Sequence, residues 1–211
     1  MAGLHDRIQR RTLDFKILRD MACESFEAEA YRSDADRRAR RNRVVSEAQA
    51  GQVSKYRFVL RVPTMVDKEV FAPVTEIGVD TDVPDYPMKE PGTSVLSSHT
   101  PWSPHFKQGL PVCIGGEFWL SKRGHVTLGH LAIHLARLLN WDEKGRGPEY
   151  LGWNGAAVAY HQNKYKGAAL NPSFVYPKLP AWLYGEDGNQ PSAFSFLGQQ
   201  LTRPPDFRFA G

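Results

Sequence analysis

Cysteine is scarce in this sequence, and its scarcity excludes a fold held together by disulfide bonds. The 211 residues include two cysteines, Cys23 and Cys113, which lie far apart and in different local contexts. Small secreted domains that depend on disulfides carry more cysteines at closer spacing. We therefore expect free thiols in a reducing compartment, and the sequence predicts a cytoplasmic protein.

Long apolar runs are missing as well. A membrane-spanning helix needs about eighteen consecutive apolar residues, and no such stretch occurs, so we expect no membrane segment. The first residues, MAGLHDRIQRRTLDF, also lack the apolar centre of a signal peptide. An apolar fraction of 41% still predicts one globular domain with a substantial core.

The net charge of +4 is small, and the basic residues are concentrated early in the chain. The segment DADRRARRNR contains a cluster of arginines at Arg37, Arg38, Arg40, Arg41 and Arg43. Phosphate contact is one interpretation of such a cluster. The cluster lacks interleaved aromatic residues and a surrounding nucleic-acid motif, so we favour a solvated connector over nucleic-acid binding.

The first secondary-structure element is predicted to be a helix from residue 4 to about residue 32. Apolar residues recur there at intervals of three, four or seven, at Leu4, Ile8, Phe15, Leu18, Ala22 and Phe26. The other faces of this helix are basic, with Arg7, Arg10, Arg11, Lys16 and Arg19. The pattern indicates an amphipathic helix with one packed side and one basic side.

Alternating apolar and polar residues then predict strands. In KYRFVLRV one face carries Tyr56, Phe58, Leu60 and Val62. A less regular alternation predicts a second strand at 74–83, and shorter strands are expected at 44–45 and 93–97. Because short connections join these segments, we expect a four-stranded antiparallel meander.

A proline-rich segment, SSHTPWSPHFKQGLPVCIGGEFW at 97–119, is predicted to be a long irregular loop. Cys113 lies near its end, with His99 and His105 before it and His125 after it. A thiol on an anchored loop near imidazoles suits nucleophilic chemistry, because the thiolate is the reactive form. The alternative is a small, inert, buried side chain, and the local sequence slightly favours that alternative.

Two further helices are predicted after this loop. A leucine-rich stripe follows the cap residue Thr127 and runs to residue 139, and WNGAAVAYHQNKY forms the next helix. His130 and His134 lie four residues apart, but the glutamate of a metalloprotease motif and a third ligand are lacking, so we expect no metal site. From residue 170, prolines and aromatic residues predict an irregular extension that lies over the domain or over a partner.

The order of these elements resembles that of the ubiquitin-conjugating enzyme (UBC) fold. YPMKEP at 86–91 resembles the family's Tyr-Pro-Phe-x-Pro-Pro turn. SPHF at 103–106 stands where the family has His-Pro-Asn-Ile, ten residues before the catalytic cysteine. Trp119 before a leucine-rich helix, and NGAAVAY at 154–160, are similar to later features of the family. The resemblance covers residues 4 to about 166.

The resemblance implies an α+β, UBC-like domain at 1–169 and an irregular extension at 170–211. It implies that Cys113 carries a ubiquitin-like modifier as a thioester and passes it to an amine, usually a lysine, of a target protein. An activating enzyme would load the modifier, and no cofactor is expected. The changed His-Pro-Asn motif resembles bacterial members, so a bacterial ubiquitination-like pathway, such as one in antiviral defence, is expected.

The resemblance also implies roles for other residues. His105 takes the position of the motif asparagine, so we expect its ring to support the oxyanion, to act as a base, or only to brace the loop. The basic side of the first helix, with Arg7, Arg10, Arg11 and Arg19, is expected to meet an acidic surface of the activating enzyme. An acidic residue would orient the lysine, and its candidates are Asp142, Glu143 and Glu149.

Other classes of function compete with this interpretation. The main alternative is a non-enzymatic binding module on the same fold, with Cys113 buried. A second is a Cys-His hydrolase that pairs Cys113 with His125 or His99. Such enzymes usually place the nucleophile at a helix N-terminus, whereas Pro111 and the glycines after Cys113 argue against a helix there.

Overall fold

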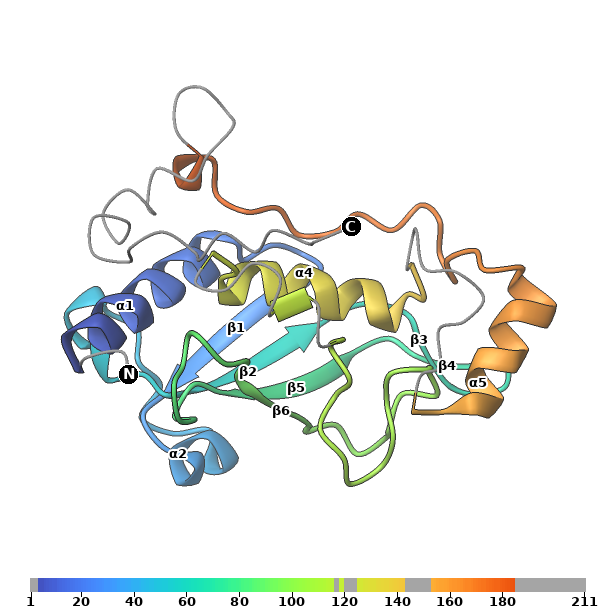
Figure 1. Ribbon diagram of the computed structural model, residues 1–211, viewed down its shortest axis with the longest axis horizontal. Helices are drawn as coiled ribbons and strands as arrows, with labels where there is room; N and C mark the ends of the chain where they lie inside the picture. Colours follow the sequence, from blue (N-terminus) through green and yellow to red (C-terminus); the bar gives the residue numbers. More distant parts are fainter. Residues whose placement is uncertain (1–3, 116–117, 120–124, 143–152, 185–211) are drawn as a thin grey trace, which may run out of the picture.

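A four-stranded antiparallel sheet forms the centre of the protein (Figure 1). The computed structural model describes residues 4–115, 118–119, 125–142 and 153–184. The strands lie in the order β1 (Phe26–Tyr31), β2 (Lys55–Leu60), β5 (Thr75–Asp80) and β6 (Gly92–Val95). A separate hairpin of β3 (Thr64–Asp67) and β4 (Val70–Ala72) lies between β2 and β5 in the chain. The architecture is α+β, as predicted.

The alternation predicted for the two clearest strands is confirmed. Tyr56, Phe58 and Leu60 of β2 are fully buried, and Ile77 and Val79 of β5 join them in the core. Arg57, which lies between Tyr56 and Phe58, faces the other side of the sheet and forms an ion pair there with Glu76. A strand with one face on the core needs this period of two, because successive side chains point to opposite faces.

The first helix is shorter than the sequence predicted. Helix α1 spans Leu4–Asp20, and the last part of the predicted helix is the edge strand β1. Phe26, Ala28 and Ala30 face the core at a period of two, as in a strand. The spacing from Leu18 through Ala22 to Phe26 also fits a helix, so the apolar pattern did not reveal where the helix ends and the strand begins. The predicted strand at 44–45 is an isolated bridge from Val44 to Ala30.

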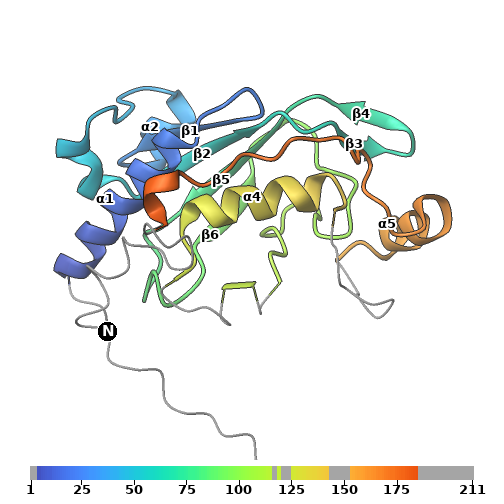
Figure 2. The same cartoon turned by 90° about the horizontal axis from the view of Figure 1, so that it is seen from above.

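Helix α4 (Leu128–Leu139) covers one face of the sheet and completes the core with α1 (Figures 1 and 2). Its leucine stripe is buried as predicted, and Thr127 caps it by accepting a hydrogen bond from the His130 backbone N–H. The His130 ring accepts in return from the Thr127 backbone N–H. His130 is therefore a capping residue of this helix.

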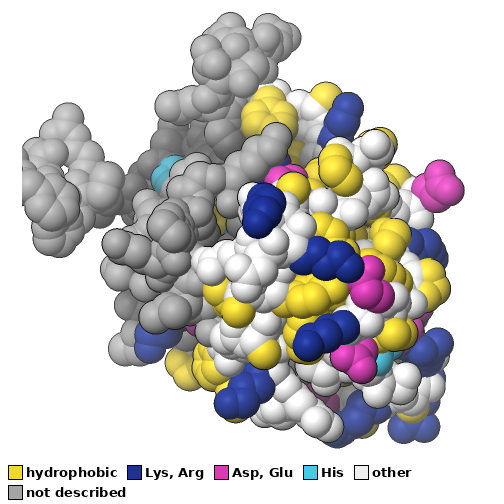
Figure 3. Space-filling model, turned by 90° about the vertical axis from the view of Figure 1, so that its right-hand side faces the viewer, with side chains coloured by type: hydrophobic (Ala, Val, Ile, Leu, Met, Phe, Trp, Pro, Cys, Tyr) yellow, Lys and Arg dark blue, Asp and Glu magenta, His cyan; other side chains and the backbone are white. Residues whose placement is uncertain are grey.

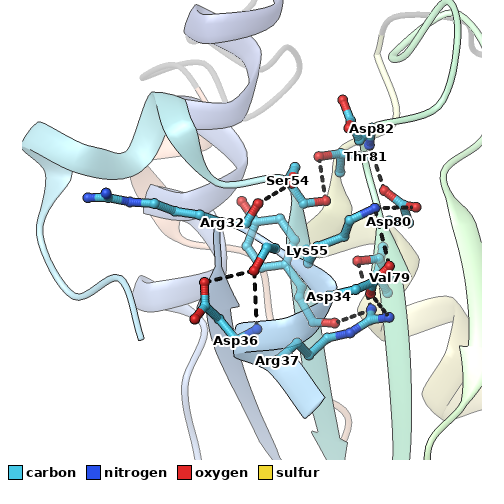
Figure 4. A network of polar contacts seen from close by, with 12 residues as sticks. Arg32, Asp34, Asp36, Arg37, Ser54, Lys55, Val79, Asp80, Thr81 and Asp82 are labelled. Atoms are coloured by element: carbon cyan, nitrogen blue, oxygen red, sulfur yellow. Dashed lines mark hydrogen bonds and ion pairs between the residues drawn. The ribbon is translucent and has the colours of Figure 1, made fainter. Parts of the chain in front are cut away.

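Hydrogen bonds from Arg37 tie the short helix α2 (Asp34–Ala39) to the sheet (Figure 4). The Arg37 guanidinium donates to the carbonyls of Tyr56 (3.1 Å) and Val79 (3.4 Å) and to the Asp34 carboxylate (2.6 Å). Lys55 Nζ lies 2.6 Å from the Asp80 carboxylate beside it. Arg37, one member of the arginine cluster, thus braces two strands.

A strap, residues 170–184, runs back along α4 towards α1 (Figures 1 and 2). It follows α5 (Gly155–Tyr160) and a π-helical turn, η2 (His161–Tyr165), which together form the predicted third helix. The strap ends in the 3-10 turn η3 (Ala181–Leu183), where Leu183 is fully buried. Another 3-10 helix, η1 (Glu47–Gln52), packs on α1. Within the described ranges, no helix has the length and apolar character needed to cross a membrane.

Candidate functional site

The segment that carries Cys113 contains neither helix nor strand from residue 97 to residue 115, as predicted. It is nevertheless fixed to the domain at several points. The Trp102 backbone N–H donates to the Met65 carbonyl at 2.7 Å, and the Phe106 side chain is 1% exposed. Buried residues on both sides of Cys113, Val112 and Ile114, anchor the cysteine itself. The thiol therefore lies on a segment that is fixed to the rest of the domain.

Two hydrogen bonds join the main chain of Cys113 to His105. The Cys113 N–H donates to the His105 carbonyl at 3.0 Å. The Cys113 carbonyl lies 2.9 Å from Nδ1 of the His105 ring. A carbonyl oxygen can only accept, so the hydrogen-bond network assigns the hydrogen to this ring nitrogen. The ring of His105 is fully buried, and its hydrogen bond to the Cys113 carbonyl braces the cysteine segment.

Side chains from two other elements hold the neighbouring carbonyls. Thr93 Oγ1 of β6 donates to the Val112 carbonyl at 3.4 Å. Nε2 of His134, on α4, donates to the Ile114 carbonyl at 2.8 Å, and its ring stacks on Phe118 with centroids 3.9 Å apart. Three successive carbonyls are thus held by the sheet, the loop and a helix, which fixes the direction of the thiol.

The Cys113 thiol is partly exposed, whereas a structural cysteine is usually sealed. A hydrogen bond from the His105 side chain holds the pKa of the thiol below its ordinary value. Partial burial opposes this effect, and hydrogen bonds from the Gly115 backbone and the Trp153 side chain reinforce it. Donors that point at sulfur stabilise the thiolate, which is the nucleophile. The arrangement suits covalent chemistry at sulfur.

A groove of about 340 Å³ lies next to this site. Its walls come from the loop and from the start of α5, and include Trp102, Phe106, Lys107, Gln108, Trp153 and Asn154. The sequence raised His134 only as a possible zinc ligand, and it did not point to Trp153 or Thr93. Their contacts join segments far apart in the chain, and no local periodicity signals such contacts.

The acidic candidates near α5 have different positions. Asp142 hydrogen-bonds the Tyr176 side chain, and its backbone N–H donates to the Arg137 carbonyl at 2.9 Å. Glu143 and Glu149 lie outside the described residues. The histidine that contacts Cys113 in the structure is His105. The Cys-His hydrolase alternative instead paired Cys113 with His99 or His125.

The four arginines expected to bind a partner differ in exposure. Arg10 is 1% exposed, and its guanidinium donates to Asp14 (2.8 Å) and to the Val126 carbonyl. It cannot be a surface contact, so its expected partner role is corrected to a structural one. Arg7 is half-buried, Arg11 pairs with Asp82 at 3.1 Å, and Arg19 pairs with Asp20 and Glu47.

No three His, Cys, Asp or Glu side chains among the described residues form a group that could hold a metal ion. Both histidines that suggested zinc have structural contacts, since His130 caps α4 and His134 holds the Ile114 carbonyl.

We expect Cys113 to be alkylated at lower pH in the folded protein than in the urea-unfolded chain. The folded thiol has the lower pKa, so more thiolate is present below the ordinary thiol pKa. The matching contribution to stability is fully present above the unfolded pKa and is lost as the pH falls through the folded pKa. The measurement is the rate of iodoacetamide labelling against pH in a Cys23→Ser background. Coincident midpoints for folded and unfolded chains would contradict the expectation.

Comparison of the chain with family models, with curated proteins and with solved structures gives no match in any of the three. The function is therefore argued from the chemistry of the site.

Proposed function

We propose that this protein is a UBC-like transferase that carries an acyl group, the C-terminus of a ubiquitin-like modifier, as a thioester on Cys113. One observation carries the proposal: a partly exposed thiol of lowered pKa sits on a segment held from three sides. An acyl carrier needs such a thiol, reactive enough to be loaded and open enough to be unloaded.

The arrangement of the chain supports this proposal in general terms. A helix at the N-terminal side, a four-stranded antiparallel sheet, a long loop with the cysteine and then further helices follow in the order expected for a UBC-like domain. NGAAVAY, the segment that resembled the family's later helix, begins α5 beside the cysteine segment. The family assignment remains part of the proposal.

Loading would be an exchange of one thioester for another. The Cys113 thiolate attacks the carbonyl of the incoming thioester, a new carbon–sulfur bond forms, and the donor thiolate leaves with its electron pair. Bonds of the same kind are made and broken, so the step is near balance. The protein has to supply a thiolate in the right direction, and the held carbonyls around Cys113 do so.

Unloading is attack by an amine. Its nitrogen forms a bond to the carbonyl carbon, the carbon–sulfur bond breaks, and the electron pair returns to Cys113 Sγ. The amine loses its proton to water or to a base. The contacts with the His105 side chain, the Gly115 backbone and the Trp153 side chain, which lower the pKa of the thiol, make the thiolate a better leaving group. His105 both braces the loop and polarises the sulfur in this scheme.

The proposal includes partners of defined chemistry. An activating-enzyme-like protein supplies the thioester, a ubiquitin-like modifier is the cargo, and a target lysine in the cytoplasm is the acceptor. Arg7, Arg11 and Arg19 remain the members of the basic set that reach the surface of α1. A non-enzymatic binding module would need no reactive thiol, and the exposure and lowered pKa of Cys113 favour the transferase.

The proposal is tested with a short glycine-ended peptide thioester of mercaptoethanesulfonate. We expect intact-protein mass analysis to show one adduct, on Cys113, that dithiothreitol removes and that free lysine discharges faster than buffer alone. Cys23, which is exposed, is the internal control for unassisted exchange. Equal loading of Cys23 and Cys113 would refute the assignment. Discharge by water as fast as by lysine would indicate a hydrolase instead.

A further inference from the structure

We propose that the groove beside Cys113 docks the segment of the target protein that carries the acceptor lysine. The groove takes an aromatic side chain of this segment, and Lys107 at its rim takes a carboxylate. The role of the lysine rests on the proposed function, but binding of an aromatic, acidic peptide in the groove does not.

The groove adjoins the cysteine through the loop and through α5. Phe106, one wall of the groove, directly follows His105, whose carbonyl accepts from the Cys113 N–H at 3.0 Å. The Asn154 N–H donates to the Pro104 carbonyl at 3.1 Å, which joins the start of α5 to the same loop. A segment held in the groove therefore lies beside the cysteine segment, which brings the amines of its side chains near a thioester on Cys113.

The walls of the groove are aromatic and fixed in place. Its volume of about 340 Å³ falls within the range of about 300 to 1,000 Å³ that is typical of ligand clefts. Trp102, Phe106 and Trp153 line it, and Trp153 is 46% exposed. The Trp102 backbone N–H donates to the Met65 carbonyl at 2.7 Å, and its ring packs edge to face on Tyr160 with centroids 5.1 Å apart. Rings attract further rings in offset or edge-to-face geometry, so these walls fit an aromatic side chain.

Gly155, the first residue of α5, keeps part of the groove open. A Cβ atom added there would meet no described atom within 4 Å apart from its chain neighbours and its own helix backbone, and its φ lies outside the left-handed region. Neither packing nor backbone conformation therefore requires a glycine. Glycine in a helix costs stability relative to alanine. What the glycine preserves is space in the groove, which a larger side chain would fill.

The charge at the groove favours an acidic occupant. Lys107 is the one charged side chain among the described residues that line the groove, and this exposed lysine has no ion pair with a described residue. Glu69, on the β3–β4 hairpin, is already paired with Lys164 at 2.5 Å. Figure 3 faces this end of the molecule, where apolar side chains lie among basic and acidic ones. A carboxylate next to the docked ring would pair with Lys107.

The probe is an acetylated and amidated peptide, Glu-Phe-Gly-Lys-Gly-Phe-Glu, with 4-fluorophenylalanine at both aromatic positions. A ring and a carboxylate stand on each side of its lysine, so either direction of binding can use them. Fluorine NMR titration measures its binding to the uncharged full chain. We expect a competitor peptide with alanine for both rings to displace the probe about tenfold less well, because it buries no ring in the groove.

Matched variants locate the binding. Gly155→Leu fills the groove and should weaken binding about tenfold, whereas Gly155→Ala should bind like the wild type. Lys107→Glu should weaken binding about threefold, and Lys178→Glu, an exposed lysine on the strap, should not. Thermal unfolding checks each fold, and Lys107→Glu still decides the outcome if Gly155→Leu is unstable. Equal binding by the wild type and Lys107→Glu, or by Gly155→Ala and a folded Gly155→Leu, would overturn the proposal.

Discharge of loaded Cys113 separates this inference from the proposed function. We expect the aromatic peptide to discharge the thioester about tenfold faster than the alanine peptide, and Gly155→Leu to abolish this preference without changing discharge by free lysine. If Gly155→Leu instead slows loading, the groove holds the carrier's tail and the proposal is wrong. If both peptides discharge equally well, the transferase stands without this docking site. If the probe binds in the groove but wild-type Cys113 is never loaded, the peptide site stands and the transferase assignment fails.

Discussion

Replacing Cys113 with serine is expected to lower formation of the thiol-sensitive adduct by about a hundredfold or more, because a hydroxyl is a far weaker nucleophile than a thiolate. Any residual product would be an oxygen ester, which dithiothreitol does not remove. The measurement is intact-protein mass analysis after incubation with the peptide thioester or, once they are identified, with the activating enzyme, the modifier and ATP.

The matched controls are Cys23→Ser and Cys113→Ala. Cys23→Ser removes the other thiol, which is exposed and hydrogen-bonded only weakly to Ser25 at 3.4 Å, and should load like the wild type. Cys113→Ala should form neither thioester nor ester. A Cys113→Ala protein that still forms the adduct would show that the acyl group resides elsewhere, and the carrier role would be withdrawn.

Asp14→Ala is expected to destabilise the fold by about 3 to 5 kcal/mol. Asp14 is fully buried and accepts from Arg10 (2.8 Å), from the Tyr86 hydroxyl (2.5 Å) and from the Leu128 N–H (2.9 Å). Burial would lower the pKa of Arg10, but Asp14 and Tyr86 outweigh it and raise that pKa. Removing Asp14 leaves a buried cation and two unpaired donors.

Urea unfolding followed by circular dichroism measures this loss. Asp82→Ala is the control, since Asp82 pairs with Arg11 at the surface, where its side chain is 62% exposed, and should cost less than about 1 kcal/mol. The double change Arg10→Met with Asp14→Leu removes the buried charges together and should recover part of the loss. Similar losses for Asp14→Ala and Asp82→Ala would show that the buried network adds little to stability.

Much of the fold could be predicted, because its clearest strands and α4 each bury one face. The apolar residues Tyr56, Phe58 and Leu60 recur at every second position, as in a strand. The leucines of α4 recur at every third or fourth position, as in a helix. The apolar pattern gave a wrong prediction where the same residues fit both the helical period and the strand period, as at Phe26. It also failed for the β3–β4 hairpin, whose tip is exposed at Val70 and Phe71 and has no apolar alternation.

The site was predictable only in part, because its decisive contacts are between distant segments. Cys113 was selected from the loop sequence and His105 from the resemblance to the UBC fold, and the structure brings them together. Arg10 was placed on a basic surface, although its position four residues before Asp14 and eight before Leu18 shares the buried side of α1. Trp153 and His134 reach the site through tertiary packing, which no local pattern records.

The strap also bears on how the protein is made. Trp182 donates to the Asp20 carboxylate across 162 positions of sequence, and Leu183 is fully buried beside it. During synthesis the first helix is therefore translated long before the residues that cover it. Pairings of such high sequence separation slow folding, so the surface of α1 that the strap covers stays exposed in a nascent chain until the strap has been translated.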